Sequence, residues 1–331
     1  MPELPEVEGF RRRLAPLIAG RPIARLDVLD AKLWRPAAGL DAGAVAGRAV
    51  QALERHAKLL LFRLDGGLTL VLHLKIAGQL VFAAPAGPRL VGGHPYPLPD
   101  ADLPAAATRF VLSFGAPGTL FVNDQRRFAW LRLLPDAAAA AFVAEQRYGP
   151  DPLDPEFTAG VLADRLAARA RRPLKAALLD QTCIAGLGNI YADESLHAAR
   201  LHPMLRTGDA TPAEIARLHR AIRDVLEVAV PVGGALVKVG RAIDEPDSER
   251  NFLRAHGRAG EPCPDCLRAG RTGPDGEPPL IVRQFLAARG TYFCPVCQPA
   301  PPGFAAAAAR AAPPDTARSE DDSAPGEDAD G

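Results

Sequence analysis

The chain has 331 residues, of which 48% are hydrophobic and 24% charged, a composition typical of soluble globular proteins. That length is sufficient for two domains, and no run of about 18 apolar residues predicts a membrane span. The 39 basic and 39 acidic residues cancel, but residues 299–331 carry a net charge of −5 and residues 1–298 a net charge of +5. A mildly basic body with an acidic tail is compatible with nucleic-acid binding, and equally with many proteins that bind none.

The N-terminal part predicts one helix followed by strands. MPELPEVEGF contains no secretory signal, so we expect a cytoplasmic protein. EVEGFRRRLAPLI predicts a helix. From about residue 22 to 134, short β-type runs alternate with turn residues, and Asp65-Gly66-Gly67 and the later GAPG are typical of hairpin turns. This region therefore predicts a β-sandwich.

The sequence changes character near Tyr148, where YGPDPLDP predicts a linker. Beyond it the pattern predicts four helices, over 156–171, 174–181, 189–200 and 212–230. The last opens with a capping box, Thr211-Pro212-Ala213-Glu214, with proline at the first helical position. Beyond Gln298 the composition is mostly Ala, Pro, Asp and Ser, which predicts disorder.

Four of the five cysteines form two Cys-x-x-Cys pairs, Cys263/Cys266 and Cys294/Cys297. This pattern predicts one structural Zn²⁺ held by four thiolates. The 27 residues between the pairs exceed the common ribbon spacing of about 15–20. The loop-like AGRTGPDGEPP inside the gap fits an extended ribbon tip. Cys183 lies in an apolar helical context and is interpreted as a small core residue.

Three further motifs allow two interpretations each. GLGNIYADESL fits either phosphate binding at a helix start or a tight turn between helices. NDQRRFAW presents arginine beside an aromatic, which suits filling a gap in a base stack, or a solvated loop with a core phenylalanine. Lys58 in ERHAKLLLF is either a phosphate ligand or a residue that ends a strand, and His73 is interpreted as a hydrogen-bonded core residue.

The N-terminus itself carries potential chemistry. Methionine before proline is readily removed, which would leave Pro2 with a free secondary amine of pKa about 8. Attack of this amine on a sugar C1′ would form an iminium ion that acidifies the C2′ proton. Glu3 is suited to protonate the opened sugar and to shuttle protons. The alternative is a frayed, proline-rich terminus.

In chain order, MPELPEVE, RHAKLLLF, HLKIAGQL, NDQRRFAW, LLDQTCIAGLGNIYADESL and RGTYFCPVCQ resemble the bacterial formamidopyrimidine-DNA glycosylases and the related endonuclease VIII group. The resemblance implies an α+β multidomain fold: an N-terminal helix plus a two-sheet β-sandwich, then a helix–two-turns–helix domain with a C-terminal zinc ribbon. The implied parts are a catalytic β-sandwich domain at 1–135, a linker at 136–152, a helix–two-turns–helix DNA-binding domain at 153–258, a zinc ribbon at 259–298 and a disordered acidic Ala/Pro-rich tail at 299–331.

The implied function is a bifunctional DNA glycosylase and AP lyase of base-excision repair. It would flip oxidised purines (8-oxoguanine, formamidopyrimidines) out of double-stranded damaged DNA, excise them and nick the strand by β,δ-elimination. We expect a monomer without membrane association or an obligate protein partner, cytoplasmic and nucleoid-associated.

Two alternatives stay open: an endonuclease VIII-like enzyme for oxidised pyrimidines, and a catalytically silent damaged-DNA-binding protein. PELPE favours the enzyme for oxidised purines over the endonuclease VIII-like alternative, since the endonuclease VIII group usually has glycine in place of Leu4. The loop that covers 8-oxoguanine in the family reads GRAIDEPDSERNFLRAHGRAGEPC here and does not match the family pattern.

The resemblance also implies roles for five residues. Pro2 becomes the Schiff-base nucleophile and Glu3 the general acid/base. Lys58 matches a lysine that donates a proton in β-elimination and contacts phosphate. Arg289 matches the ribbon-tip arginine of δ-elimination and phosphate binding, and Glu6 a buried carboxylate that supports the active site.

The implied DNA-binding residues include departures from the family pattern. Asn189 matches an asparagine that grips the DNA backbone beside the lesion. Arg126 and Phe128 match two residues inserted into the space left by the flipped base, but Ile76 replaces the usual methionine and is stiffer and shorter. A histidine that contacts phosphate is replaced by Ala107.

Overall fold

The structure is a computed structural model of the chain, and it describes residues 1–95, 102–235, 252–286 and 289–302. Contacts within it define two units. Unit 1 comprises Met1–Asp151 with Leu226–Ser248, and unit 2 comprises Pro152–Val225 with Glu249–Gly331. Within the described ranges, each helix is too short or too polar to cross a bilayer. The tail predicted to be disordered lies, from residue 303 onward, outside the described residues.

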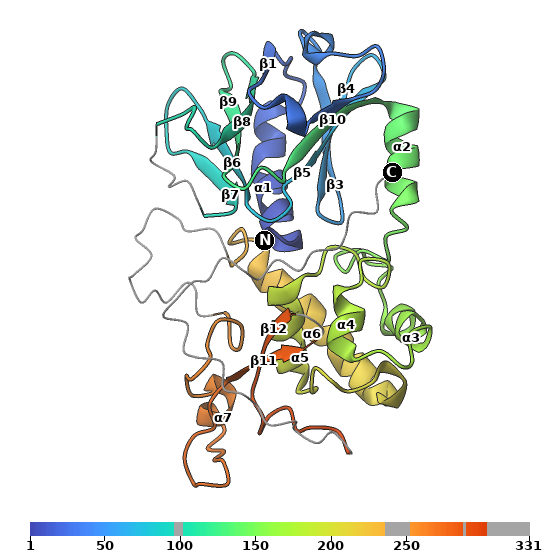
Figure 1. The fold of residues 1–331 in the computed structure, drawn as a ribbon, viewed down its shortest axis with the longest axis vertical. Coiled ribbons are helices and arrows are strands. Elements are labelled where there is room, and N and C mark those ends of the chain that lie inside the picture. Colours follow the sequence, from blue (N-terminus) through green and yellow to red (C-terminus); the bar gives the residue numbers. More distant parts are fainter. Residues whose placement is uncertain (96–101, 236–251, 287–288, 303–331) are drawn as a thin grey trace. The chain divides into compact units, whose positions relative to one another are not determined.

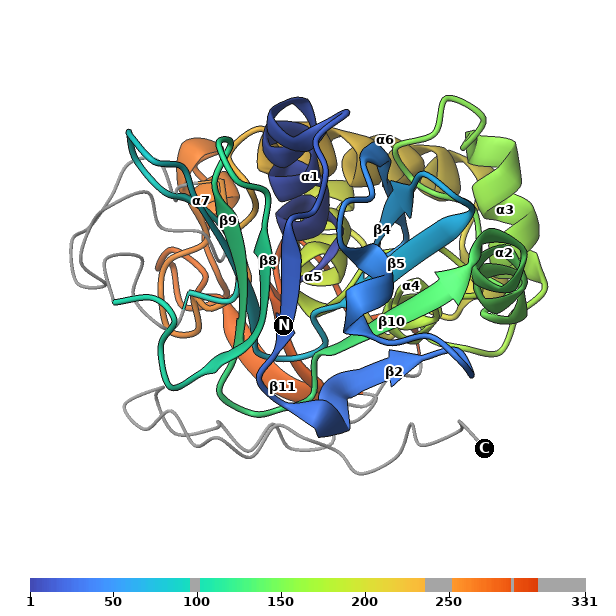
Figure 2. The ribbon, with the colours of Figure 1, turned by 90° about the horizontal axis from the view of Figure 1, so that it is seen from above.

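Unit 1 contains the predicted two-sheet β-sandwich (Figures 1 and 2). One sheet has the strand order β1-β8-β9-β6-β7 and the other β2-β10-β5-β4-β3. Neighbouring strands are antiparallel, except that β2 and β10 are parallel. The strands are β1 (Arg25–Val28), β2 (Trp34–Pro36), β3 (Val50–His56), β4 (Leu59–Leu64), β5 (Leu68–His73), β6 (Gly78–Ala83), β7 (Leu90–Gly93), β8 (Thr108–Ser113), β9 (Thr119–Asp124) and β10 (Trp130–Pro135).

Helix α1 (Leu4–Ile18) extends the predicted N-terminal helix by two residues at its start. Its apolar side chains recur at helical spacing and are buried. The helix contacts β7 and β3, the terminal strands of the two sheets, so it covers edges that would otherwise expose unpaired backbone groups. Gly92 in β7 permits the close fit, because a Cβ there would lie 2.5 Å from the Phe10 ring.

The predicted hairpin turns are confirmed. Asp65–Gly67 joins β4 to β5, and both glycines have positive φ. The GAPG turn joins β8 to β9. Two short 3-10 helices, Ala31–Leu33 and Ala42–Val45, connect the first strands. Side chains from both sheets and α1 form one continuous apolar core.

Helix α2 (Asp136–Glu145) was not predicted, because its stretch was interpreted as linker. Its five consecutive alanines have the highest helix propensity of any residue. Phe142 packs edge-on against Trp130 of β10, with ring centroids 5.8 Å apart. The helix therefore lies against the outer face of a sheet.

Unit 2 contains the four predicted helices, with narrower bounds than the sequence pattern suggested. They are α3 (Ala159–Ala167), α4 (Leu174–Leu179), α5 (Asn189–Ala199) and α6 (Pro212–Ala229), whose last turn belongs to unit 1. The predicted capping box is confirmed: the Glu214 amide donates to Thr211 Oγ1 (3.3 Å), and the Thr211 amide donates to Glu214 Oε2 (2.8 Å). Cys183 is fully buried, as predicted.

The C-terminal part of unit 2 is small and rich in cysteine. It contains the short helix α7 (Pro264–Arg268) and an antiparallel hairpin of β11 (Val282–Leu286) and β12 (Arg289–Phe293). A 3-10 helix, Thr207–Asp209, lies earlier in the chain, between α5 and α6. The core of the C-terminal part has seven buried residues, of which four are cysteines. The apolar surface available for burial is therefore limited, and other interactions must hold this part together.

Candidate functional site

The first residues of unit 1 are structured rather than frayed, although Met1 itself is 41% exposed. Pro2 is buried, and Glu3 and Glu6 are 1% and 0% exposed. Glu3 is the N-cap of α1, and its amide donates to Glu6 Oε2 at 2.9 Å. This capping box fixes the first residues of the chain at the start of the helix.

Charged side chains surround the N-terminal amine. Burial lowers the pKa of the Met1 amine, and the positive charges of Lys58 and Arg126 lower it further, while Glu3 and Glu6 act in the opposite direction. A lowered pKa increases the fraction of neutral, nucleophilic amine at neutral pH. Four of the residues singled out in the sequence therefore act on the same end of the chain.

Glu6 is held by a turn that the sequence reasoning missed. Gly234 has φ +84°, and a Cβ at this position would collide with the Glu6 carboxylate. Gly9 of α1 makes a similar close approach, since a Cβ there would lie 2.6 Å from the carbonyl oxygen of Val230. The Gly233-Gly234 pair in the sequence is a typical turn signal, but nothing in its pattern indicates that it packs on α1.

Lys58 lies in the tight β3–β4 turn, beside Ala57 with φ +51°, and is 8% exposed. The following residue, Leu59, pairs with His73 at the end of β5. His73 Nδ1 accepts a hydrogen bond from the Lys75 amide (2.8 Å), which agrees with its interpretation as a hydrogen-bonded residue. Burial, with the charges of Lys75 and Lys58, lowers the pKa of His73 to about 3, so its ring is neutral.

Two connections cross between the sheets at this same end of the sandwich. One runs from β5 to β6 and carries Ile76, and the other runs from β9 to β10 and carries Arg126 and Phe128. They are neighbours, because Gly78 pairs with Asp124. Ile76 is half-buried.

A single carboxylate shapes the β9–β10 connection. Asp124 is 0% exposed and accepts hydrogen bonds from the amides of Arg126 (2.9 Å), Phe128 (2.7 Å) and Ala129 (2.6 Å). Phe128 is 44% exposed, and the Arg126 guanidinium lies 5.2 Å from the centre of its ring. The interpretation of Phe128 as a core residue is therefore wrong. An exposed aromatic beside an arginine suits contact with nucleobases.

In unit 2, Asn189 and Arg289 are neighbours. Asn189 is the first residue of α5, after the N-cap Gly188, and its Nδ2 donates to the carbonyl oxygen of Gly290 at 2.9 Å. Arg289 directly precedes Gly290, is exposed, and pairs with Leu286 across the hairpin. The helix start and the guanidinium both suit binding of phosphate.

A buried polar group behind this pair was missed by the sequence reasoning. Lys175 Nζ donates to Asp193 Oδ1 (2.6 Å) and to the Gly290 carbonyl oxygen (3.3 Å). Asp193 Oδ2 lies 2.8 Å from His256 Nδ1. Glu194 accepts hydrogen bonds from three consecutive amides, those of residues 254–256. The sequence did contain one indication of this cluster: Asn189 and Asp193 are four residues apart, which places them on the same face of a helix.

The four cysteines meet in unit 2, with all four sulfur atoms within 4.8 Å of one another. The Sγ–Sγ distances are 3.1 Å for Cys266–Cys297, 3.6 Å for Cys263–Cys297 and 3.9 Å for Cys266–Cys294. Tetrahedral Zn–S bonds of about 2.3 Å place sulfur atoms about 3.8 Å apart. This four-cysteine cluster is therefore close to the geometry that a metal ion requires.

The protonation of the four-cysteine cluster also fits a cation. Hydrogen bonding to the Cys294 thiol lowers the pKa of Cys263, whereas burial raises the pKa of Cys297. One thiolate is thus favoured and further thiolates are opposed, so full deprotonation requires a positive charge at the centre.

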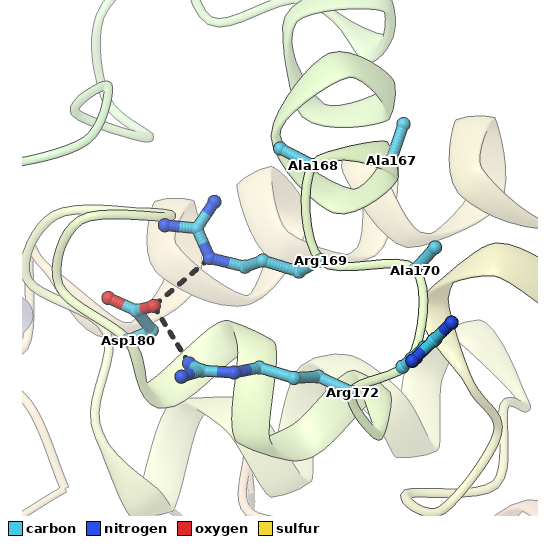
Figure 3. Close-up of a pocket in the computed structure, with 7 residues that line it drawn as sticks. Ala167, Ala168, Arg169, Ala170, Arg172 and Asp180 are labelled. Carbon is cyan, nitrogen blue, oxygen red and sulfur yellow. Dashed lines mark hydrogen bonds and ion pairs between the residues drawn. The ribbon is translucent and has the colours of Figure 1, made fainter.

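A pocket of about 670 Å³ in unit 2 is lined by residues 167–172 and Asp180. Figure 3 shows the side chains that line it. Asp180 Oδ2 lies 3.0 Å from both Arg169 Nε and Arg172 Nη1. Arg169 also donates to Thr182 Oγ1 at 2.6 Å. These contacts tie the loop after α3 to the turn after α4. Because Asp180 is engaged by two arginines, we assign the pocket a structural role.

Comparisons with known proteins agree with this arrangement. Residues 1–131 match the family model of the formamidopyrimidine-DNA glycosylase N-terminal domain, and residues 148–240 match that of the formamidopyrimidine-DNA glycosylase H2TH domain. The formamidopyrimidine-DNA glycosylase of Symbiobacterium thermophilum is 41% identical over 95% of this chain and 94% of its own length. That of Chloroflexus aurantiacus is 40% identical over 90% and 98%.

Solved structures give the same picture. The wild-type Lactococcus lactis Fpg (MutM) bound to DNA containing N7-benzyl-Fapy-dG matches with a TM-score of 0.73 and 28% identity. The Lactococcus lactis Fpg bound to DNA containing an abasic site also matches with a TM-score of 0.73. Each match covers 90% of this chain and 100% of the other.

Proposed function

The chain belongs to the formamidopyrimidine-DNA glycosylase family, and we propose that it is a bifunctional glycosylase and AP lyase that removes oxidised purines from double-stranded DNA. The single observation that carries the proposal is the ordered start of the chain, where Pro2, Glu3 and Glu6 are buried beside the N-terminal amine and the charges of Lys58 and Arg126 also act on it. A terminus with only a structural function does not require charged groups around its amine, whereas a nucleophilic amine requires groups that adjust its pKa.

The proposed chemistry starts once Met1 is removed. The Pro2 nitrogen attacks C1′ of the damaged nucleotide, the bond between C1′ and the base breaks, and the base leaves with a proton. Glu3 protonates the ring oxygen as the sugar opens, which yields an iminium ion between Pro2 and C1′. The positive nitrogen then acts as an electron sink.

Strand cleavage follows from that sink. In β-elimination the Glu3 carboxylate, having given up its proton, takes the C2′ proton, and the 3′ phosphate departs with Lys58 as the proposed proton donor. Loss of the 5′ phosphate is δ-elimination, which we assign to Arg289 together with phosphate binding. Hydrolysis of the iminium releases Pro2, so the enzyme is regenerated. Each elimination transfers one proton and one phosphate leaving group, and no redox partner is needed.

DNA binding is assigned to both units. Ile76, Arg126 and Phe128, on the paired connections of unit 1, are proposed to fill the space left by the flipped nucleotide. Exposure of Phe128 and its stacking with Arg126 support this role. Asn189, at the start of α5, is proposed to hold the DNA backbone with Arg289.

The four-cysteine cluster is proposed to bind one Zn²⁺ through four thiolates, with a structural function. Such an ion would neutralise the thiolates and join the two Cys-x-x-Cys turns, which stabilises the base of the β11–β12 hairpin. We further propose that the protein acts as a cytoplasmic monomer on damaged DNA, with no obligate protein partner.

Matched duplexes test the substrate class. One carries 8-oxoguanine opposite cytosine, a second carries an oxidised pyrimidine, and a third is undamaged. We expect nicking of the first at the highest rate. Faster nicking of the second would place the protein with the pyrimidine-directed enzymes, and binding without nicking would indicate a silent damage-binding protein.

Pro2→Gly tests the nucleophile in the same assay. We expect nicking to fall at least about 100-fold, because the secondary amine is lost, while affinity for a duplex with an uncleavable abasic analogue stays unchanged. Nicking at the wild-type rate would refute the assignment of Pro2.

A further inference from the structure

One face of α5 carries polar residues at four-residue intervals: Asn189, Asp193 and His197. Residues i and i+4 lie above one another on a helix, so these side chains form a single row. Each makes a contact with the C-terminal part of unit 2. Asn189 bonds to Gly290 and Asp193 to His256, as described above, and His197 reaches Cys263 of the four-cysteine cluster.

His197 is the member of this row without an assigned role. It is 1% exposed, and its Nε2 lies 3.4 Å from Cys263 Sγ. Its other ring nitrogen, Nδ1, is buried and makes no hydrogen bond within the described residues, and Asp265 Oδ2 is 3.7 Å away. We assign the ring proton to Nε2, since Nε2 has a partner within hydrogen-bonding range and Nδ1 does not.

We propose that His197 is a positioning residue of the metal site, which donates its Nε2–H to the Cys263 thiolate and so fastens α5 to the four-cysteine cluster. The proposal rests on the zinc site proposed above. An N–H hydrogen bond orients the thiolate that accepts it. It also reduces the repulsion between that thiolate and the neighbouring thiolates. Partners of this kind, outside the ligands themselves, commonly change metal affinity by about 10- to 100-fold.

The same contact connects the metal to the DNA-binding surface. His197 and Asn189 are eight residues apart on one helix, a distance of about 12 Å along its axis. The cluster therefore sets the position of the C-terminal half of α5, and β12 sets the position of its start through Gly290. Loss of the His197 contact weakens one of these two attachments.

The alternative is that His197 is only a buried aromatic ring. His197→Phe retains a ring of similar size but removes the donor, whereas His197→Gln retains an N–H at a similar reach. His219→Phe is the matched control, because His219 also lies in a helix of unit 2 but its Nε2 contacts the carbonyl oxygen of Phe157 (2.7 Å) rather than a thiolate.

The measurement is the rate of zinc transfer from the full-length, zinc-loaded protein to a chromophoric chelator. Cobalt-substituted samples add a second readout, the thiolate-to-cobalt charge-transfer band. We expect His197→Phe to release zinc about 10-fold faster or more and to shift the band. His197→Gln should restore much of the retention, and His219→Phe should behave as wild type.

Other outcomes are distinguishable. Equal zinc retention and an unshifted band in His197→Phe would overturn the inference, as would equally fast release from His197→Phe and His197→Gln. A wild-type protein that holds no zinc would overturn the zinc site itself, and with it this role of His197.

Discussion

The two units hold their functional residues by different means. In unit 1, a large apolar core supports the sandwich, and strand pairing aligns the connections that carry Ile76 and Phe128. In unit 2, the core of the C-terminal part has seven residues, four of them cysteines, and buried polar contacts attach it to α5. The comparison teaches that the functional residues proposed in unit 1 depend on packing, whereas Asn189 and Arg289 in unit 2 depend on the four-cysteine cluster and on hydrogen bonds.

The largest effect expected in unit 1 is chemical rather than structural. Glu3→Gln keeps the size of the side chain at the N-cap but removes the acid/base function. We expect the rate of excision and nicking to fall about 10²- to 10⁴-fold, as is typical for loss of a general acid/base. Single-turnover kinetics on the 8-oxoguanine duplex measure this directly.

The matched control is Glu54→Gln, which changes a carboxylate that pairs with Arg63 on the surface of the same unit. It should leave the rate unchanged. A Glu3→Gln enzyme as fast as wild type would remove Glu3 from the mechanism, and the distinction between the two units would then lose its chemical basis.

A smaller effect is expected from the metal site, and it should be confined to unit 2. Cys263→Ser removes one thiolate and should release the metal, which frees the hairpin that carries Arg289. We expect DNA affinity to fall about 10- to 100-fold, the range for one or two lost charge-assisted contacts. Titration of a duplex with an abasic analogue, by fluorescence anisotropy, measures it.

The near-ultraviolet spectrum of the tryptophans tests whether the effect is limited to unit 2, because Trp34 and Trp130 both belong to unit 1. It should not change when zinc is removed by a chelator. Loss of the tryptophan signal on chelation would contradict the separation between a packed unit and a metal-dependent one.

The smallest expected effect is on stability, and it concerns an ionic network of unit 1 around Glu8. Glu8 Oε2 lies 3.0 Å from Arg55 Nε, and Arg55 Nη1 lies 2.7 Å from Asp151. Burial alone would raise the pKa of Glu8, but hydrogen bonds from Arg11 and Arg12 and the charge of Arg55 lower it to about 2.

A carboxylate with a lowered pKa in the folded state stabilises the fold above its unfolded pKa of about 4.5, and this contribution is lost as pH falls toward 2. Allowing for solvent screening, we expect Glu8→Gln to lower the free energy of unfolding by about 2 kcal/mol at pH 7. The difference from wild type should shrink between pH 4.5 and 2 in urea unfolding experiments. A difference that is constant with pH would contradict the pKa assignment.

Much of the fold was predictable because its signals are local. Glycine-rich turns predicted the hairpins, and the capping box predicted the start of α6. The spacing of the cysteines predicted that they would meet, since two Cys-x-x-Cys turns need only one hairpin between them to converge. Helix α2 was missed because an alanine run carries no amphipathic pattern, and its docking on the sheet is a tertiary contact.

The site was less predictable, because its supports come from distant parts of the chain. Lys175, Asp193 and Gly290 are polar groups with no shared local pattern, and the fold alone brings them together. Gly234 reads as an ordinary turn glycine until its contact with Glu6 is seen. Sequence reasoning identified the residues suited to the chemistry and missed those that hold them.

The measurement that tests the central claim most directly is borohydride trapping on the 8-oxoguanine duplex, followed by mass spectrometry of the digested adduct. Reduction of the proposed iminium ion should give a covalent protein–DNA complex attached through the nitrogen of Pro2, with Met1 absent. An adduct at another residue, such as Lys58, or strand cleavage with no adduct, would contradict the account.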